Sequence, residues 1–264
     1  MDGSASEINV ILIGLLASLG AGLMTAVGAL PVLFGREIDR RARDTLLGFA
    51  AGVMLAASFF SLILPAIDAA ELRTGSTFLA ALIAGAGIAL GAGTVAGLNA
   101  AIPHEHFVSG REGVATEGLA RIWLFVLAIT IHNFPEGLAV GVGFGDGNVA
   151  GGMALAVGIG LQNAPEGLAV AVALRGQGYS RLYSFLVAAA TGLIEPVGGL
   201  IGVVAVTAAE WVLPWGLGFA AGAMVYVISH EIIPETHRSG HQNRATTGLI
   251  GGLILMMILD VTFG

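Results

Sequence analysis

One short phrase is written twice in this chain, and each time it lies in the middle of an apolar segment. The copies occupy residues 132–140 (HNFPEGLAV) and 162–170 (QNAPEGLAV). Each places a carboxamide, a proline and a glutamate where a helix buried in lipid normally carries only hydrocarbon. A charged side chain at the centre of a bilayer costs from about 2.5 kcal/mol upward. The repetition therefore indicates the two halves of one cation site.

The composition is that of an integral membrane protein. The chain is 56% hydrophobic and 11% charged, whereas a soluble domain carries about 25% charged residues. It has no cysteine, so a metal would be held by His, Asn, Gln, Asp, Glu or Met. The formal charge of -7 gives no indication of nucleic-acid binding, because several acids lie inside apolar segments. The N-terminus lacks the basic region of a signal peptide, which predicts that the first apolar run is retained.

Eight stretches are long and apolar enough to cross a bilayer, which takes about 20 residues each. The sequence thus predicts an all-α polytopic protein with a single transmembrane domain over 1–264. One long polar insert, 100–121, separates the third and fourth spans and contains His104 and His106. The predicted spans are roughly 8–34, 45–67, 77–99, 122–144, 149–174, 182–206, 212–233 and 246–263.

Arginine placement predicts the orientation in the membrane. Ten arginines lie in or beside the loops that join spans 1 and 2, 3 and 4, 5 and 6, and 7 and 8. Only Arg73 lies in one of the remaining loops. Because cytoplasmic loops carry the excess of basic residues, both termini should face outward and the insert 100–121 should face the cytoplasm. The ten are Arg36, Arg40, Arg41, Arg43, Arg111, Arg121, Arg175, Arg181, Arg238 and Arg244.

A second repeat flanks the central pair. Residues 49–54 (FAAGVM) open the second span and residues 219–224 (FAAGAM) open the seventh, and Pro65 and Pro234 follow at nearly the same distance. These two spans run in opposite directions, which is the mark of an inverted-topology repeat. Helices 1–3 and 6–8 would then be related around helices 4 and 5, a 3+2+3 arrangement. The alternative is that small-residue runs recur by chance in glycine-rich spans.

Helical geometry groups the side chains of the repeated phrase. Residues four apart share a face, so His132 lies beside Glu136 and Gln162 beside Glu166. The asparagine that follows the first residue of each copy is turned about 100 degrees and can serve an adjacent site. The proline of each copy removes a backbone hydrogen bond, which predicts a kink and a carbonyl open to an ion. The glycine after each glutamate would let the two helix backbones come close.

Glu195, near the middle of the sixth span, adds a third buried carboxylate. Left without a counter-charge the three would repel, and at least one would be protonated. A divalent cation would neutralise them, and carboxylate, imidazole and amide ligands suit zinc or another first-row metal. Met54 is a candidate soft ligand. The alternatives are protonated acids bonded to their neighbours and a methionine that only fills the core. Ser58 and Ser61 are interpreted as packing hydroxyls.

On these motifs the chain resembles the ZIP (Zrt/Irt-like) metal transporters, and most closely their prokaryotic members. The resemblance covers nearly the whole chain. It implies uptake of zinc, and also of cadmium, iron or manganese, across the cell's plasma or inner membrane into the cytoplasm. It also implies a centre for two ions bridged by Glu136 and Glu166. By motif, the first ion would take Met54, His132, Glu136, Gln162 and Glu166, and the second would take Asn133, Glu136, Asn163, Glu166 and Glu195.

One position departs from the family pattern. Residue 163 is a carboxylate in some members and Asn163 here, which lowers the negative charge of the second site. Further metal ligands are predicted at His230 and Glu231, interpreted as a release station at the inner mouth, with a polar interface cluster as the alternative. The pair does not form the HExxH motif of zincins, since Pro234 takes the second histidine's place.

Three functions fit these residues. The first is a carrier of divalent metal. The second is a metal-selective channel, which would line its path with the same groups. The third is an intramembrane metal-dependent hydrolase, which lacks a recognisable nucleophile or catalytic motif, so no catalytic residue is predicted. The expected partners are metal ions and the lipid bilayer. A homodimer is compatible with the chain, although the sequence does not fix the oligomeric state.

Overall fold

The computed structural model describes residues 2–35, 39–101, 104–106, 110–112, 121–145, 147–237 and 240–263. Within these residues, eight helical segments are long and apolar enough to cross a membrane. This confirms the predicted all-α membrane protein with eight spans. The insert between the third and fourth spans contains a short antiparallel hairpin, which the sequence did not indicate. Its strands are β1 (His104–His106) and β2 (Gly110–Glu112).

Several spans are built from more than one helical segment. The first four spans are α1 (Asp2–Leu33), α2 (Arg40–Ala57) with η1 (Ser58–Ile63) and α3 (Leu64–Thr74), α4 (Thr77–Ala101), and α5 (Arg121–Phe144). The other four are α6 (Val149–Gly176), α7 (Arg181–Thr191) with η2 (Gly192–Ile194) and α8 (Glu195–Ala208), α9 (Leu213–Val227) with η4 (Ile228–Ile232) and α10 (Ile233–His237), and α11 (Gln242–Phe263). A short turn, η3 (Glu210–Val212), precedes α9.

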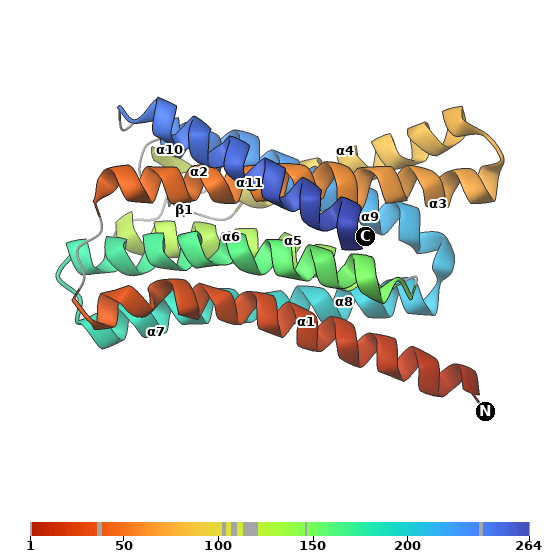
Figure 1. Ribbon diagram of the computed structural model, residues 1–264, viewed down its shortest axis with the longest axis horizontal. Coiled ribbons are helices and arrows are strands. Elements are labelled where there is room, and N and C mark those ends of the chain that lie inside the picture. Colours follow the sequence, from red (N-terminus) through yellow and green to blue (C-terminus); the bar gives the residue numbers. More distant parts are fainter. Residues whose placement is uncertain are drawn as a thin grey trace.

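The helices that carry the repeated phrase are the innermost. In α5 and α6, 72% and 78% of the most apolar stretch is buried, against 17% in α11. In Figure 1, α1, α7 and α8 lie on one side of α5 and α6, and α2, α4 and α11 lie on the other. The main packing pairs are α2 with α11, α4 with α9, α1 with α6, and α5 with α8. Both copies of the phrase are therefore enclosed by the other spans.

The second repeat makes matching contacts in its two locations. A Cβ built at Gly52 would lie 1.9 Å from the carbonyl oxygen of Leu249 on α11. A Cβ built at the equivalent Gly222 would lie 2.0 Å from the carbonyl oxygen of Ile88 on α4. Each FAAG run thus packs its glycine against a neighbouring backbone, an approach that only a residue without a side chain allows.

A widened helical turn follows each copy of this second repeat. The π-helical segments η1 and η4 begin four residues after Met54 and Met224, and each ends two residues before a proline, Pro65 or Pro234. Proline disturbs the hydrogen bond to the carbonyl four residues earlier, and at Pro65 and Pro234 a π turn precedes the proline. Single π turns occur frequently at functional sites, and η4 contains both His230 and Glu231.

Candidate metal centre

The repeated phrases meet in the interior, as the sequence predicted. Gln162 Nε2 on α6 donates a hydrogen bond of 2.7 Å to Glu136 Oε1 on α5. His132, Glu136, Gln162 and Glu166 are all buried, with at most 4% of each residue exposed. The antiparallel arrangement of the two helices brings these polar side chains to one depth. Both helices continue through their proline as single segments.

The third predicted carboxylate joins the second copy of the phrase. Asn163 Nδ2 donates to Glu195 Oε1 at 2.7 Å and to the carbonyl oxygen of Ala21 at 2.9 Å. Glu195 is fully buried and begins α8, directly after the η2 turn. Three helices, α1, α6 and α8, therefore converge on one carboxamide.

Gly137 and Gly167 do not bring the backbones of α5 and α6 close together, as the sequence suggested they would. A Cβ built at Gly137 would lie 2.1 Å from the carbonyl oxygen of Glu195, and one built at Gly167 would lie 2.0 Å from that of Thr25. The close backbone contacts are therefore between α5 and α8 and between α6 and α1. The reason is that each central helix turns its glycine toward a flanking helix and its polar side chains toward the other central helix.

Glu231 belongs to the central cluster, although the sequence placed it at the inner mouth. Its Oε2 forms an ion pair with His132 Nε2, and its Oε1 accepts a hydrogen bond of 3.0 Å from Asn99 Nδ2 on α4. Glu231 and Asn99 are 4% and 2% exposed. The π turn η4 brings this carboxylate inward. Its neighbour His230 instead stacks on Tyr226, with ring centroids 5.0 Å apart.

Several buried polar atoms of the cluster have no hydrogen-bond partner within the part of the chain that the structure describes. They include both polar atoms of the Asn133 side chain and one carboxylate oxygen on each of Glu136, Glu166 and Glu195. A buried polar atom left without a partner costs about 1–3 kcal/mol. Oxygen atoms in this condition are suitable donors for a cation, so the residues fit the predicted ligand set.

The cluster is not arranged as a finished metal site. Among the described residues, no three His, Asp or Glu side chains converge closely enough to hold one ion. The reason is that the candidate ligands bond to one another: Gln162 to Glu136, Asn163 to Glu195, and His132 to Glu231. An entering cation would have to replace these contacts.

Comparison with known proteins identifies the family. The family model described as ZIP zinc transporter matches residues 100–260. Zinc transporter GufA of Myxococcus xanthus is 47% identical over 95% of this chain and 99% of its own length. Zinc transporter ZIPB of Bordetella bronchiseptica is 49% identical over 91% of this chain and 78% of its own length. The chain belongs to the ZIP zinc transporter family.

Membership of the ZIP family confirms the resemblance inferred from the repeated phrase. A more distant member, zinc transporter ZupT of Chlorobaculum parvum, is 33% identical over 96% of this chain. The family consists of transporters, so the hydrolase alternative is contradicted. The individual ligand assignments stay predictions.

Met54, the candidate soft ligand of this ZIP chain, is 1% exposed and lies in the largest hydrophobic cluster. Its carbonyl oxygen accepts a hydrogen bond of 2.8 Å from Ser58 Oγ, a bond within one helical span, so the packing role of Ser58 stays a prediction. Ser61 donates to Asp260 Oδ1 on α11, a contact between two spans that agrees with its interpretation as a packing hydroxyl. Both Ser61 and Asp260 line a cavity of about 550 Å³.

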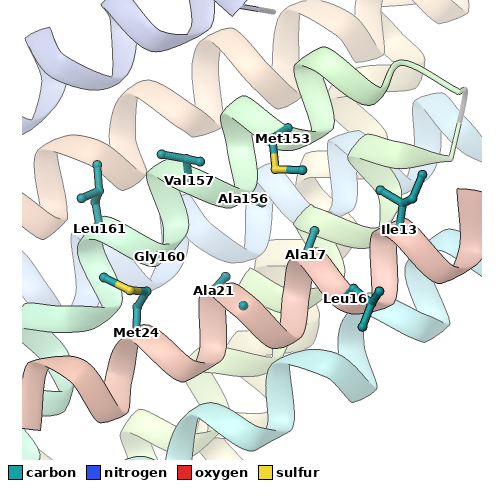
Figure 2. A pocket seen from close by; sticks show the side chains of 11 residues that line it. Ile13, Leu16, Ala17, Ala21, Met24, Met153, Ala156, Val157, Gly160 and Leu161 are labelled. Carbon is teal, nitrogen blue, oxygen red and sulfur yellow. The ribbon is translucent and has the colours of Figure 1, made fainter.

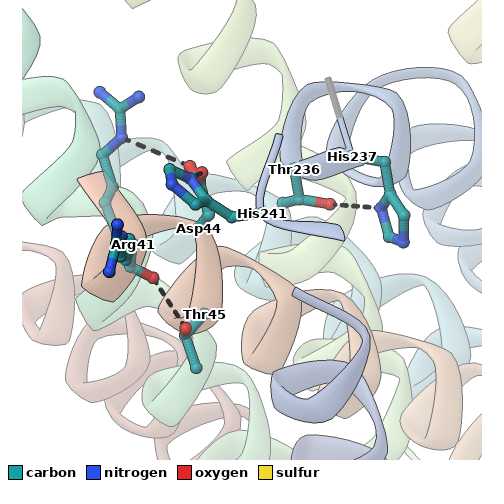
Figure 3. Close-up of polar contacts among 7 residues, drawn as sticks. Arg41, Asp44, Thr45, Thr236, His237 and His241 are labelled. Atoms are coloured by element: carbon teal, nitrogen blue, oxygen red, sulfur yellow. Dashed lines mark hydrogen bonds and ion pairs between the residues drawn. The ribbon is translucent and has the colours of Figure 1, made fainter. Parts of the chain in front are cut away.

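At the arginine-rich end, two histidines of the ZIP chain make polar contacts (Figure 3). His241 Nδ1 lies 2.8 Å from Asp44 Oδ2, a pairing that the sequence did not indicate. His237 Nδ1 lies 3.0 Å from Thr236 Oγ1. The side chains of His104 and His106 lie outside the described part of the chain.

Proposed function

We propose that this ZIP-family chain moves zinc ions across the membrane into the cytoplasm through the cluster between α5 and α6. One observation carries the proposal: three buried glutamates, Glu136, Glu166 and Glu195, each retain a carboxylate oxygen without a partner among the described residues. A divalent cation would supply the missing counter-charge. The relatives at 47% and 49% identity are named zinc transporters, which favours zinc as the ion.

We place the ligands in two adjacent sets. His132, Glu136, Gln162 and Glu166 would hold the first ion, with Met54 as a sulfur ligand from α2. Asn133, Asn163 and Glu195 would hold the second, with Glu136 and Glu166 bridging. The contact of Asn163 with Glu195 supports the second set. The same oxygen and nitrogen ligands would accept cadmium, iron or manganese.

Glu231 connects this centre to the next step of the path. Because it contacts His132, it would compete with an ion for the imidazole and then become a ligand itself when the ion enters. Asn99 holds the other carboxylate oxygen. Glu231 would therefore serve as the exit from the centre toward the arginine-rich end, where His237 follows in the chain.

We further propose that helices 1–3 and 6–8 form an inverted repeat around α5 and α6. Under this relation α2 corresponds to the α9 span and α4 to α11, so the α2–α11 and α4–α9 packing pairs become equivalent. The pairs α1–α6 and α5–α8 become equivalent in the same way. The matching π turns support the relation. In an inverted repeat the two related units can exchange conformations, so that the site opens alternately to either side of the membrane.

The orientation follows from the arginines. The C-terminal ends of α1, α6 and α10 lie at one end in Figure 1, and the N-terminus lies at the other. We propose that the arginine-rich end faces the cytoplasm and both termini face outward, in the plasma or inner membrane. A homodimer is part of this proposal.

Zinc uptake into proteoliposomes tests the proposal. The purified chain should show saturable uptake, and the isosteric double variant Glu136→Gln, Glu166→Gln should show none. The control is Glu71→Gln. The Glu71 carboxylate lies outside the cluster and accepts a hydrogen bond from Thr77, so this variant should leave uptake unchanged. Wild-type flux through the double variant would contradict the proposed path. Single-channel electrical currents would show that the protein works as a channel and not as a carrier.

A further inference from the structure

A groove between α1 and α6 opens on the outside of the helix bundle (Figure 2). It has a volume of about 560 Å³, and every residue that lines it is apolar. Leu16, Gly20 and Met24 form the α1 side, and Met153, Val157 and Gly160 form the α6 side. Side chains 45–55% exposed stand at its mouth: Leu16, Met153 and Val157.

The groove follows a seam of small residues along which α1 and α6 stay close, since a Cβ built at Gly160 would lie 3.6 Å from the Cα atom of Ala21. Further along the pair the backbones touch, since a Cβ built at Gly28 would lie 1.8 Å from the carbonyl oxygen of Ala164. At Gly20 a built Cβ would meet nothing within 4 Å. Small residues, among them Ala17 and Ala156, line the floor and leave the space unfilled.

The surroundings of the groove determine what can occupy it. Both helices are candidate membrane spans, so the groove opens toward lipid hydrocarbon, and its apolar lining offers water no hydrogen bond. From Ile13 to Met24 it extends about 16 Å along α1. The hydrocarbon core of a bilayer is about 30 Å thick, so the groove covers the depth of about one leaflet, the layer that the acyl chains of one lipid occupy.

We propose that this groove binds one acyl chain of a membrane phospholipid and that the chain supports α1 against α6. Ala21 lies on the groove floor, and its carbonyl oxygen accepts the hydrogen bond from Asn163. The bound chain would thus lie directly behind one of the candidate ligands. Binding of the lipid does not depend on the proposed zinc transport.

Native mass spectrometry of the purified chain with dioleoyl phosphatidylethanolamine tests the proposal. Gly20→Leu adds a side chain in the groove at a glycine whose built Cβ meets nothing within 4 Å, and Gly93→Leu adds the same side chain to another exposed glycine with nothing within 4 Å. Wild type and Gly93→Leu should retain one more lipid than Gly20→Leu. The same difference should appear in the Glu136→Gln, Glu166→Gln background, so a failure of the transport proposal would leave this result intact.

Equal lipid retention by all three proteins would overturn the inference. It would also be overturned if Gly20→Leu changed the oligomeric state and not the lipid count, since the groove would then hold a second copy. A measurement on the unmutated protein makes the test independent of folding of the variants. Crystals grown with a phospholipid brominated in its acyl chain should show bromine between Leu16 and Val157, and bromine spread evenly around the bundle would contradict the proposal.

Discussion

Asn133 and Asn163 hold the same position in two copies of one phrase, yet their surroundings differ. Asn163 donates to Glu195 and to the carbonyl oxygen of Ala21. Asn133 is equally buried, and neither polar atom of its side chain has a hydrogen-bond partner in the described residues. The flanking helices cause the difference, because α1 and α8 present acceptors to Asn163. Identical residues therefore make unequal contacts: Asn163 ties α6 to α1 and α8, and Asn133 makes no such link among the described residues.

The residues that open the two copies differ in the same way. Gln162 directs its amide to Glu136 within the central pair, whereas His132 contacts Glu231 on η4. The α6 copy is thus tied to α1 and α8, and the α5 copy to the α9–α10 span. The polar contacts of the cluster therefore reach α1 and α8 from α6, and the α9–α10 span from α5.

The largest effect is expected from the residue that the two copies share. Glu136→Gln and Glu166→Gln should each lower zinc uptake at least about 100-fold, equivalent to about 2.7 kcal/mol, because each glutamate is proposed to bridge both ions. Uptake into proteoliposomes with an internal zinc indicator measures this. If only one of the two variants lost activity, the bridging assignment would be wrong for the other glutamate.

Making the copies alike should have the next largest effect. His132→Gln removes the imidazole ligand and the ion pair with Glu231, and should weaken zinc binding about 10- to 100-fold, or about 1.4–2.8 kcal/mol. Isothermal titration of detergent-solubilised protein measures the change. The control Gln162→Asn keeps a carboxamide in the other copy and should have a smaller effect. Unchanged zinc affinity in His132→Gln would remove that residue from the first ligand set.

The two asparagines should respond differently to the same substitution. Asn163→Leu leaves Glu195 and the Ala21 carbonyl without their donor and should destabilise the metal-free protein by about 1–3 kcal/mol. Asn133→Leu removes polar atoms that have no partner among the described residues, so the metal-free stability should stay the same or rise. Thermal unfolding in detergent with a chelator compares the variants. Equal destabilisation by both would contradict the asymmetry.

The smallest effect is expected from placing a carboxylate at residue 163, in the proposed second site. Asn163→Asp replaces a donor by a charge beside Glu195, so it should lower the unfolding temperature of the metal-free protein. With zinc, the added charge should strengthen binding about tenfold, or about 1.4 kcal/mol, and the stabilisation by zinc should increase. An unfolding temperature that responds to zinc as in wild type would show that residue 163 does not contact the ion.

The sequence by itself determined where the eight spans lie, that the repeated phrase lies inside two of them, and which residue types form the cluster. Apolar stretches of membrane length and glutamates within them are local properties, so they can be interpreted without knowing which helices touch. The similarity of residues 49–54 and 219–224 also predicted the inverted repeat, a proposal that the matching π turns support.

Only the tertiary structure decided which partner each polar side chain takes. Glu231 was predicted at the inner mouth, but the widened turn η4 moves it to His132, a contact between residues far apart in the chain. The glycines after the glutamates pack against α8 and α1, and not against each other. Ser61 in the second span donates a hydrogen bond to Asp260 in the eighth. Such pairings depend on the packing of whole helices, and helical periodicity fixes only which side chains share a face, not which neighbour that face meets.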